Sequence, residues 1–179
     1  MTSRVPAPAR RITTIIRSGE SFLKHNSIPQ TLGLRPAPGL VTDYLFWAAI
    51  MAGVIVSVLL AANKLSAIPQ GMGSYALLSL LLWYPVVEEL AFRGVVQGTL
   101  TDYPFARRKR LGISVANLIA SFTFVLWHLL YQANPIIMAL ALPSLVYGFF
   151  RDRYQSLLPA LLLHSLYNGC FFAAHRLYS

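Results

Sequence analysis

The feature that most limits how this chain can fold is a series of five apolar segments, each close to the ~20 residues that cross a bilayer as a helix. Backbone N–H and C=O groups must be bonded internally in lipid, so such segments form helices. Hydrophobic residues make up 56% of the chain and charged residues 12%. We therefore predict an all-α fold, a polytopic transmembrane helix bundle of about five spans. The predicted spans are Tyr44–Ala62, Tyr75–Gly98, Leu111–Tyr131, the shorter Pro135–Phe150, and Leu157–Leu177.

The distribution of positive charge predicts how the bundle is oriented. Of 15 Lys and Arg residues, six precede the first span, Lys64 alone follows it, four form the run Arg107–Arg110, and Arg151 and Arg153 follow the fourth span. Cytoplasmic loops are enriched in Lys and Arg, so this alternation predicts a cytoplasmic N-terminus. Contact with the lipid bilayer accounts for the net charge of +9 without a nucleic-acid partner. We expect a multi-pass protein of the cell membrane, plasma or inner.

The first 41 residues differ from the rest, and we treat them as a separate basic segment before a helical domain at 42–179. Apolar residues recur there at helical spacing among Arg11, Arg17 and Lys24. The apolar set is Ile12, Ile15, Ile16, Phe22 and Leu23. This pattern is typical of an amphipathic helix lying on an anionic membrane surface. A partly ordered basic tail is the alternative.

Three ionisable residues lie inside the second apolar segment. Glu88 and Glu89 are adjacent, and Arg93 follows Glu89 by four residues. Each charge near the centre of a span costs roughly 2.5 to 3.5 kcal/mol, which makes these residues candidates for function. Glu89 and Arg93 share a helix face and can form an ion pair. Glu88 is rotated by about 100° from Glu89, so it lacks that partner and is free to accept and return a proton.

Two later spans carry polar groups that complement the glutamates. His128 ends the run Phe124-Val-Leu-Trp-His128, and His164 and Asn168 stand four residues apart on the last span. A single histidine in a span is commonly a hydrogen-bonding residue in helix packing. Together, however, a carboxylate, two imidazoles and a carboxamide are the groups needed to activate a water and stabilise an oxyanion.

These residues form a pattern that resembles a known family. The motifs Glu88-Glu89-Leu-Ala-Phe-Arg93, Phe124-x-x-x-His128 and His164-x-x-x-Asn168, in this order, are similar to those of the type II CAAX prenyl endopeptidase and bacteriocin-processing family of intramembrane glutamic proteases. The resemblance extends from about Tyr75 to Phe172. Each motif is weak alone, and their combination in membrane segments is specific.

The resemblance implies an intramembrane endopeptidase with no cofactor and no metal. Glu88 would be the general base that deprotonates a water, and His128 would orient that water. His164 and Asn168 would donate hydrogen bonds to the oxyanion, and the Glu89–Arg93 pair would support them. The substrate would be the C-terminal tail or leader of a membrane-associated protein or peptide, and the sequence does not say whether it is prenylated.

Three other interpretations remain open at this stage. Glu88, His128 and His164 could be the ligands of a catalytic zinc ion, although no His-Glu-x-x-His motif is present. The polar cluster could instead hold partner helices in a non-catalytic membrane scaffold or chaperone, or line an ion path in a transporter.

The predicted span boundaries conflict with a shared site. At a rise of about 1.5 Å per residue from the cytoplasmic ends, Glu88 lies at roughly 15 Å, His164 at roughly 10 Å and His128 at roughly 25 Å. Straight helices with these boundaries do not bring the three together. Either the third span is tilted or begins after Leu111, or the boundaries are wrong by about one turn.

Pro85, three residues before Glu88, interrupts the second span. A proline inside a helix lacks the N–H that an earlier carbonyl would accept, and it bends the helix. The bend could open room for a water beside Glu88 or could serve packing alone.

Overall fold

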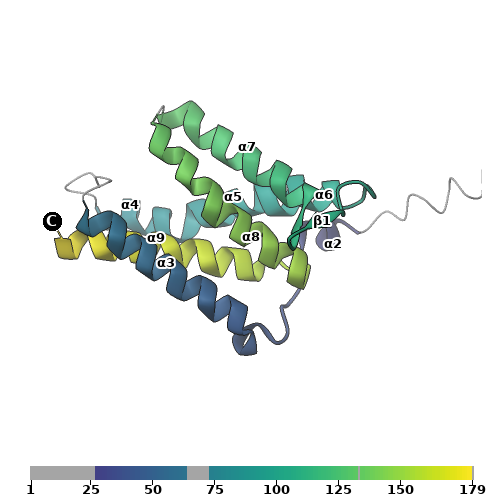
Figure 1. Cartoon of the computed structure of the whole chain (residues 1–179), viewed down its shortest axis with the longest axis horizontal. Coiled ribbons are helices and arrows are strands. Elements are labelled where there is room, and N and C mark those ends of the chain that lie inside the picture. The colour runs from purple at the N-terminus through teal and green to yellow at the C-terminus, as the bar shows by residue number, and fades with distance from the viewer. Residues whose placement is uncertain (1–26, 64–72, 133, 179) are drawn as a thin grey trace, which may run out of the picture.

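The computed structural model describes residues 27–63, 73–132 and 134–178, and these form a helical bundle with one small hairpin (Figure 1). The predicted all-α class is confirmed. The long helices are α3 (Tyr44–Ala62), the continuous helix Ser74–Leu100, α7 (Val115–Gln132), α8 (Ala141–Tyr154) and α9 (Leu158–Tyr178). The short elements are α2 (Ile28–Leu32), the 3₁₀ turns η1 (Leu40–Thr42) and η4 (Pro135–Leu140), and the strands β1 (Lys109–Arg110) and β2 (Ile113–Ser114).

Each predicted span overlaps one of the long helices, but not all of these helices have the properties of a complete span. The predicted bounds Pro135–Phe150 are wrong, because Pro135–Leu140 forms a 3₁₀ helix and α8 continues to Tyr154. The helices α3, Ser74–Leu100 and α7 are long and apolar enough to cross a membrane. In contrast, α8 has 14 residues, or roughly 21 Å of helix. The chain is a membrane protein with three such candidate spans among its described residues, and α8 and α9 pack with them.

The helix Ser74–Leu100 is made of five stretches with different backbone hydrogen bonding. The α-helical parts α4 (Ser74–Leu78), α5 (Tyr84–Glu89) and α6 (Gly98–Leu100) alternate with two π-helical parts, η2 (Ser79–Trp83) and η3 (Leu90–Gln97). Pro85 is the second residue of α5, directly after the first π-helical stretch. Because π-helical turns are often found at functional sites, their position on both sides of the two glutamates is notable.

The third predicted span begins later than expected. Leu111 and Gly112 have φ values of 52° and 82° and form the turn of the hairpin β1–β2. Positive φ at both central residues is the geometry of a tight hairpin turn, which glycine favours. The side chain of Ser114 accepts the N–H of Asn117 and so caps α7. The predicted start at Leu111 is therefore wrong by four residues, because an apolar residue in the turn extended the hydrophobic run.

The core lies where α3, α8 and α9 meet. Phe46, Phe150 and Leu163 are buried there, and the rings of Phe46 and Phe150 pack edge to face with centroids 5.6 Å apart. Gly53 permits the close approach of α3 to α9, since a Cβ at this position would lie 2.2 Å from the ring of Tyr167. Many large apolar side chains of α3 and α7 are exposed, among them Trp47, Met51 and Phe122, as expected for helices that face lipid.

The chain from Ser27 to Thr42 packs on the bundle. Arg151 donates to the carbonyl of Thr31 over 2.7 Å, and the N–H of Leu157 donates to the carbonyl of Gly33. These bonds connect α2 to the turn between α8 and α9. The predicted surface helix, with Ile12, Ile15, Ile16, Phe22 and Leu23, lies outside the described residues, and the division of the chain at residue 41 stays a prediction.

Candidate active site

Three helices bring the predicted polar residues together. Glu88 lies on α5, His128 near the end of α7, and His164 near the start of α9. The Oε2 atom of Glu88 is 3.9 Å from Nε2 of His128 and 3.7 Å from Nε2 of His164. These distances are slightly too long for direct hydrogen bonds, and a polar gap of this size is commonly bridged by water.

The three residues lie together, although the predicted span boundaries placed them at different depths. Because α7 begins at Val115, His128 is four residues nearer to the start of its helix than predicted. Four residues correspond to about 6 Å of helix, which moves His128 from roughly 25 Å to roughly 19 Å, near the depth of Glu88 but still about 9 Å from that of His164. A later start of the third span was one of the two explanations that the sequence left open.

Glu89 is the centre of a buried network. Its Oε2 atom lies 3.3 Å from Nε of Arg93, and both side chains are 0% exposed. Its Oε1 atom lies 2.9 Å from Nδ1 of His164. Arg93 in turn donates to the carbonyl and hydroxyl oxygens of Ser144 on α8. The predicted Glu89–Arg93 pair is present, and Glu89 also holds the ring of His164, which the sequence spacing did not indicate.

The hydrogen bonds at Nδ1 determine which atom each imidazole presents to Glu88. The Nδ1 of His128 lies 2.9 Å from the carbonyl of Phe124, and a carbonyl can only accept a hydrogen bond. Nδ1 of His128 therefore carries a hydrogen, and Nε2 is the ring nitrogen that faces Glu88. For His164 the partner is the carboxylate of Glu89, so Nδ1 carries a hydrogen here too.

Aromatic rings surround the two histidines. The ring of Tyr147 stacks on His164 at 5.0 Å with a 16° interplanar angle, and Phe124 lies 4.4 Å from the ring of His128. The guanidinium of Arg93 lies over both Phe124 and Tyr147. Tyr147 and Ser144 were not predicted. In the sequence they are separated by three residues, which indicates that they share one face of α8 but does not indicate a function.

Asn168 bonds to the backbone of the glutamate-bearing helix. Its Nδ2 donates to the carbonyl of Leu80 over 2.9 Å. In this π-helical turn the N–H of Tyr84 bonds to Ser79, and the next residue, Pro85, has no N–H. The carbonyl of Leu80 would accept the N–H of Tyr84 in an α-helix and that of residue 85 in a π-helix, and it has neither. The Nδ2 of Asn168 supplies the hydrogen bond in their place. The sequence predicted that Pro85 frees a carbonyl, and the structure identifies the side chain that satisfies a carbonyl in this turn.

Exposure separates Glu88 from Glu89. The side chain of Glu88 is 20% exposed and that of His128 is 17% exposed, whereas those of Glu89 and Arg93 are enclosed. Glu88 is therefore the carboxylate that a water or a substrate can reach. Glu89 can act only through the side chains it touches.

The comparison with protein families adds an independent observation. Residues 70–170 match the family model described as type II CAAX prenyl endopeptidase Rce1-like. The chain belongs to this Rce1-like family. No curated protein and no solved structure matches it. The match includes all six predicted site residues and ends before His175.

Membership in the Rce1-like family supports a coarse statement of function. Rce1-like proteins are CAAX-type membrane proteases, so this chain is a hydrolase of the membrane that acts on protein or peptide substrates. Within the part of the chain that the structure describes, no group of three or more His, Cys, Asp and Glu side chains is arranged to hold a metal ion.

Proposed function

We propose that this Rce1-like protein is an intramembrane glutamic endopeptidase in which Glu88 activates the attacking water. The observation that supports this most directly is the position of the Glu88 carboxylate, within 4 Å of the Nε2 atoms of both His128 and His164. A water bound between these atoms would face a base and a hydrogen-bond acceptor at once.

In the proposed reaction Glu88 takes one proton from the water as the water oxygen bonds to the substrate carbonyl carbon. The Nε2 atom of His128, which is unprotonated in this scheme, accepts a hydrogen bond from the second O–H of the water and so orients it. The carbonyl oxygen becomes an oxyanion. When the C=O bond re-forms, the C–N bond breaks, and Glu88 returns its proton to the leaving nitrogen.

The proposal assigns a positive charge to His164. With Nδ1–H donated to Glu89, a second hydrogen on Nε2 makes the ring a donor for the oxyanion. Glu88, Glu89, Arg93 and a protonated His164 then carry no net charge. Such a balance favours the placement of four ionised groups within the membrane.

Asn168 supplies the other oxyanion donor in this scheme. A carboxamide has two N–H bonds, and one of them is used by the carbonyl of Leu80. The second is left for the substrate. Asn168 would thus hold the bent helix in place and contribute to the transition state with one side chain.

The substrate we propose is a peptide bond in the C-terminal tail or leader of a membrane-associated protein.

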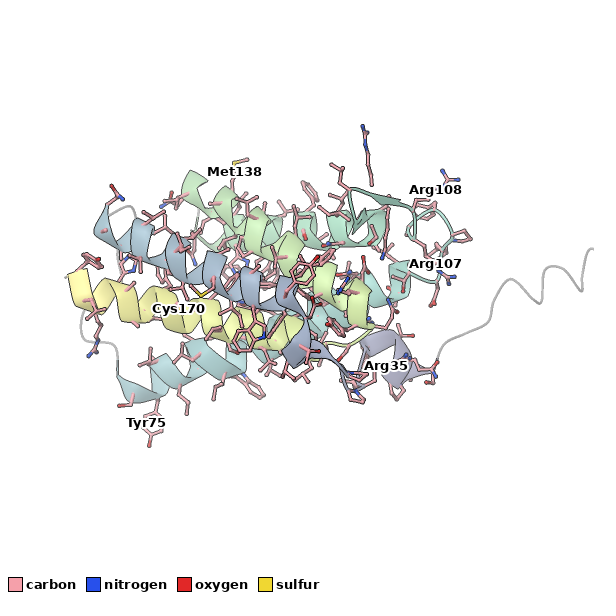
Figure 2. All side chains as sticks on the ribbon, turned by 60° about the horizontal axis from the view of Figure 1, so that its bottom comes forward. Arg35, Tyr75, Arg107, Arg108, Met138 and Cys170 are labelled. Carbon is pink, nitrogen blue, oxygen red and sulfur yellow. The ribbon has the colours of Figure 1, made fainter. Side chains whose placement is uncertain are left out.

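The N-terminus would be cytoplasmic, because Arg35, Arg107 and Arg108 lie toward one end of the bundle and Tyr75 toward the other (Figure 2). The basic segment at 1–41 and the helical domain at 42–179 remain the proposed division.

A cleavage assay with a membrane-embedded peptide reporter tests the mechanism. Glu88→Gln keeps the size of the side chain and removes the base, and His164→Ala removes one donor. Both should reduce turnover by at least roughly 10²-fold, while Asp102→Asn, an acidic residue beyond the same helix, serves as the control. Full activity in both variants would contradict the proposed mechanism, and no cleavage by the wild-type protein would favour a scaffold.

The same assay decides between water activated by glutamate and by zinc. Exhaustive chelation should leave the turnover of the wild-type protein unchanged. Loss of activity on chelation with recovery on added zinc would overturn the glutamate mechanism.

A further inference from the structure

A second polar region lies at the end of the bundle that carries the hairpin. It is a cavity of about 400 Å³ lined by Thr101, Arg107, Lys109, Ser114, Asp152 and Gln155. This volume is within the range of small-molecule sites, ~300–1,000 Å³. Thr101 follows Glu88 by thirteen residues, or roughly 20 Å of helix, so the cavity is separate from the proposed catalytic residues.

The hairpin positions two of the lining residues. Lys109 and Ser114 are direct cross-strand partners, so their side chains share one face, and the pair Arg110 and Ile113 occupies the other. Arg107 is fixed because its Nε donates to the carbonyl of Thr101, which leaves the terminal nitrogens of its guanidinium available. Two cations therefore line the cavity, and the position of one of them, Arg107, is fixed by a hydrogen bond.

The buried wall of the cavity carries an incompletely bonded carboxylate. Asp152 is 9% exposed, and its Oδ1 atom accepts from Nε2 of Gln97 over 2.8 Å. Its Oδ2 atom has no hydrogen-bond partner among the described residues, and none of their ion pairs includes Asp152. Arg151 attracts this carboxylate electrostatically but forms no hydrogen bond with it. A buried oxygen without a hydrogen bond is unfavourable, so a cationic donor in the cavity would stabilise it.

The position of the cavity indicates where its ligand comes from. The candidate span Ser74–Leu100 ends just before Thr101, and the candidate span Val115–Gln132 begins just after Ser114. The cavity is therefore at the boundary between the apolar helices and the polar connections, the level at which phospholipid headgroups lie. Arg107 and Arg108 are at this end of the molecule in Figure 2.

We propose that this cavity binds the headgroup of an aminophospholipid, a phosphate diester that carries a primary amine. The phosphate is bound by Arg107 and Lys109, with the Ser114 hydroxyl as a further donor. The ammonium group is bound by Asp152. Neither group alone matches the lining, because a phosphate provides no donor for the unbonded Oδ2 of Asp152 and an amine provides no acceptor for Arg107 and Lys109.

Lipid titration of the purified, delipidated full-length protein tests this inference. Phosphatidylethanolamine, phosphatidylcholine and phosphatidylglycerol with identical short acyl chains are compared by native mass spectrometry. Phosphatidylethanolamine should bind about tenfold more tightly than the other two, since only it presents both a phosphate and a charged N–H donor. Asp152→Asn should abolish the preference over phosphatidylcholine.

The basic run provides a matched control. Arg107→Gln with Lys109→Gln should weaken binding about tenfold, whereas Arg108→Gln with Arg110→Gln removes the same charge from outside the cavity and should leave binding unchanged. Equal weakening by both double variants would overturn the proposal in favour of general electrostatic attraction. If Asp152→Asn does not fold, Lys109→Gln alone, on the exposed hairpin, tests the phosphate contact.

Two further outcomes would contradict the assignment. Equal affinity for phosphatidylethanolamine and phosphatidylcholine in the wild-type protein would exclude recognition of the amine by Asp152. Free phosphoethanolamine that competes as well as the lipid would exclude a lipid as the source of the headgroup.

Discussion

The same local arrangement of phenylalanine and histidine occurs twice in this molecule. In α7 the Nδ1 atom of His128 lies 2.9 Å from the carbonyl of Phe124, and in α9 that of His175 lies 2.9 Å from the carbonyl of Phe171. The ring centroids are 4.4 Å and 4.2 Å apart, with interplanar angles of 40° and 44°. The two pairs are nearly identical in local geometry.

The difference between the pairs lies in what surrounds them. His128 faces Glu88 from a neighbouring helix. His175 is eleven residues beyond His164, or roughly 16 Å further along α9. A histidine bonded to the carbonyl four residues earlier does not by itself indicate a catalytic role, and the role proposed for His128 depends on the neighbouring Glu88.

The largest expected effect comes from replacing the two histidines in parallel. His128→Gln should lower kcat by roughly 10²- to 10⁴-fold, the contribution of an acid–base group, because the water loses its orienting acceptor. His175→Gln removes the same local contact and should change kcat by less than about twofold. Comparable losses in both variants, measured in the reporter assay, would mean that the local arrangement itself is what matters.

A smaller effect is expected at Glu89, which touches no substrate in this scheme. Glu89→Gln should lower kcat by roughly 10²-fold with little change in KM, because the ring of His164 loses the carboxylate that stabilises its charge. It also leaves Arg93 buried without a counter-ion, which costs about 3–5 kcal/mol of stability.

The double variant Glu89→Gln with Arg93→Gln separates these two effects. When both charges are removed, the melting temperature should rise most of the way back to the wild-type value while kcat stays low. If the melting temperature and kcat both return to wild-type values, the ion pair has a purely structural role.

The third prediction concerns the carbonyl of Leu80. Asn168→Ala should destabilise the protein by about 1–3 kcal/mol, because a partly buried carbonyl loses its donor. Adding Pro85→Ala restores a backbone N–H in the π-helical turn and should recover the melting temperature. If the double variant is as unstable as Asn168→Ala, the bond to Leu80 does not explain the loss.

The smallest effect is expected outside the spans, at Asp43. A hydrogen bond from Tyr154, with others from the Leu45 N–H and Arg153, lowers the pKa of Asp43 below its ordinary value of 3.8. The ionised carboxylate therefore stabilises the fold above this value, and the contribution disappears as the pH falls through the lower, folded-state pKa. Asp43→Asn should lower the melting temperature at pH 7, and the difference from wild type should shrink below about pH 4.

Much of the site could be predicted from the sequence because charged residues are rare in apolar segments. Glu88, Glu89 and Arg93 were identified by the cost of burying them, and the Glu89–Arg93 pair by its spacing. The link from Glu89 to His164 joins residues 75 positions apart, and no local pattern contains it. The bond from Asn168 to Leu80 depends on a π-helical turn, which periodicity at 3.6 residues does not reveal.

The fold was predicted less evenly than the site. The bounds of α3 were predicted correctly because its apolar run is bounded by Asp43, which caps the helix, and by Asn63. The start of α7 was not, because Leu111 is apolar yet occupies a turn with positive φ. Hydropathy measures the solvent that a residue prefers, and a turn is decided by backbone geometry.

The ion pair between Glu89 and Arg93 also has a consequence for how the protein is made. Both partners belong to one helix, so their charges can offset each other as soon as that helix forms. The helices that supply His128 and His164 are synthesised later, and the chain emerges from the ribosome N-terminal end first. We infer that this segment can enter the bilayer before the helices of His128 and His164 are made. Glu88 is then the carboxylate of the segment that has no ion-pair partner on its own helix.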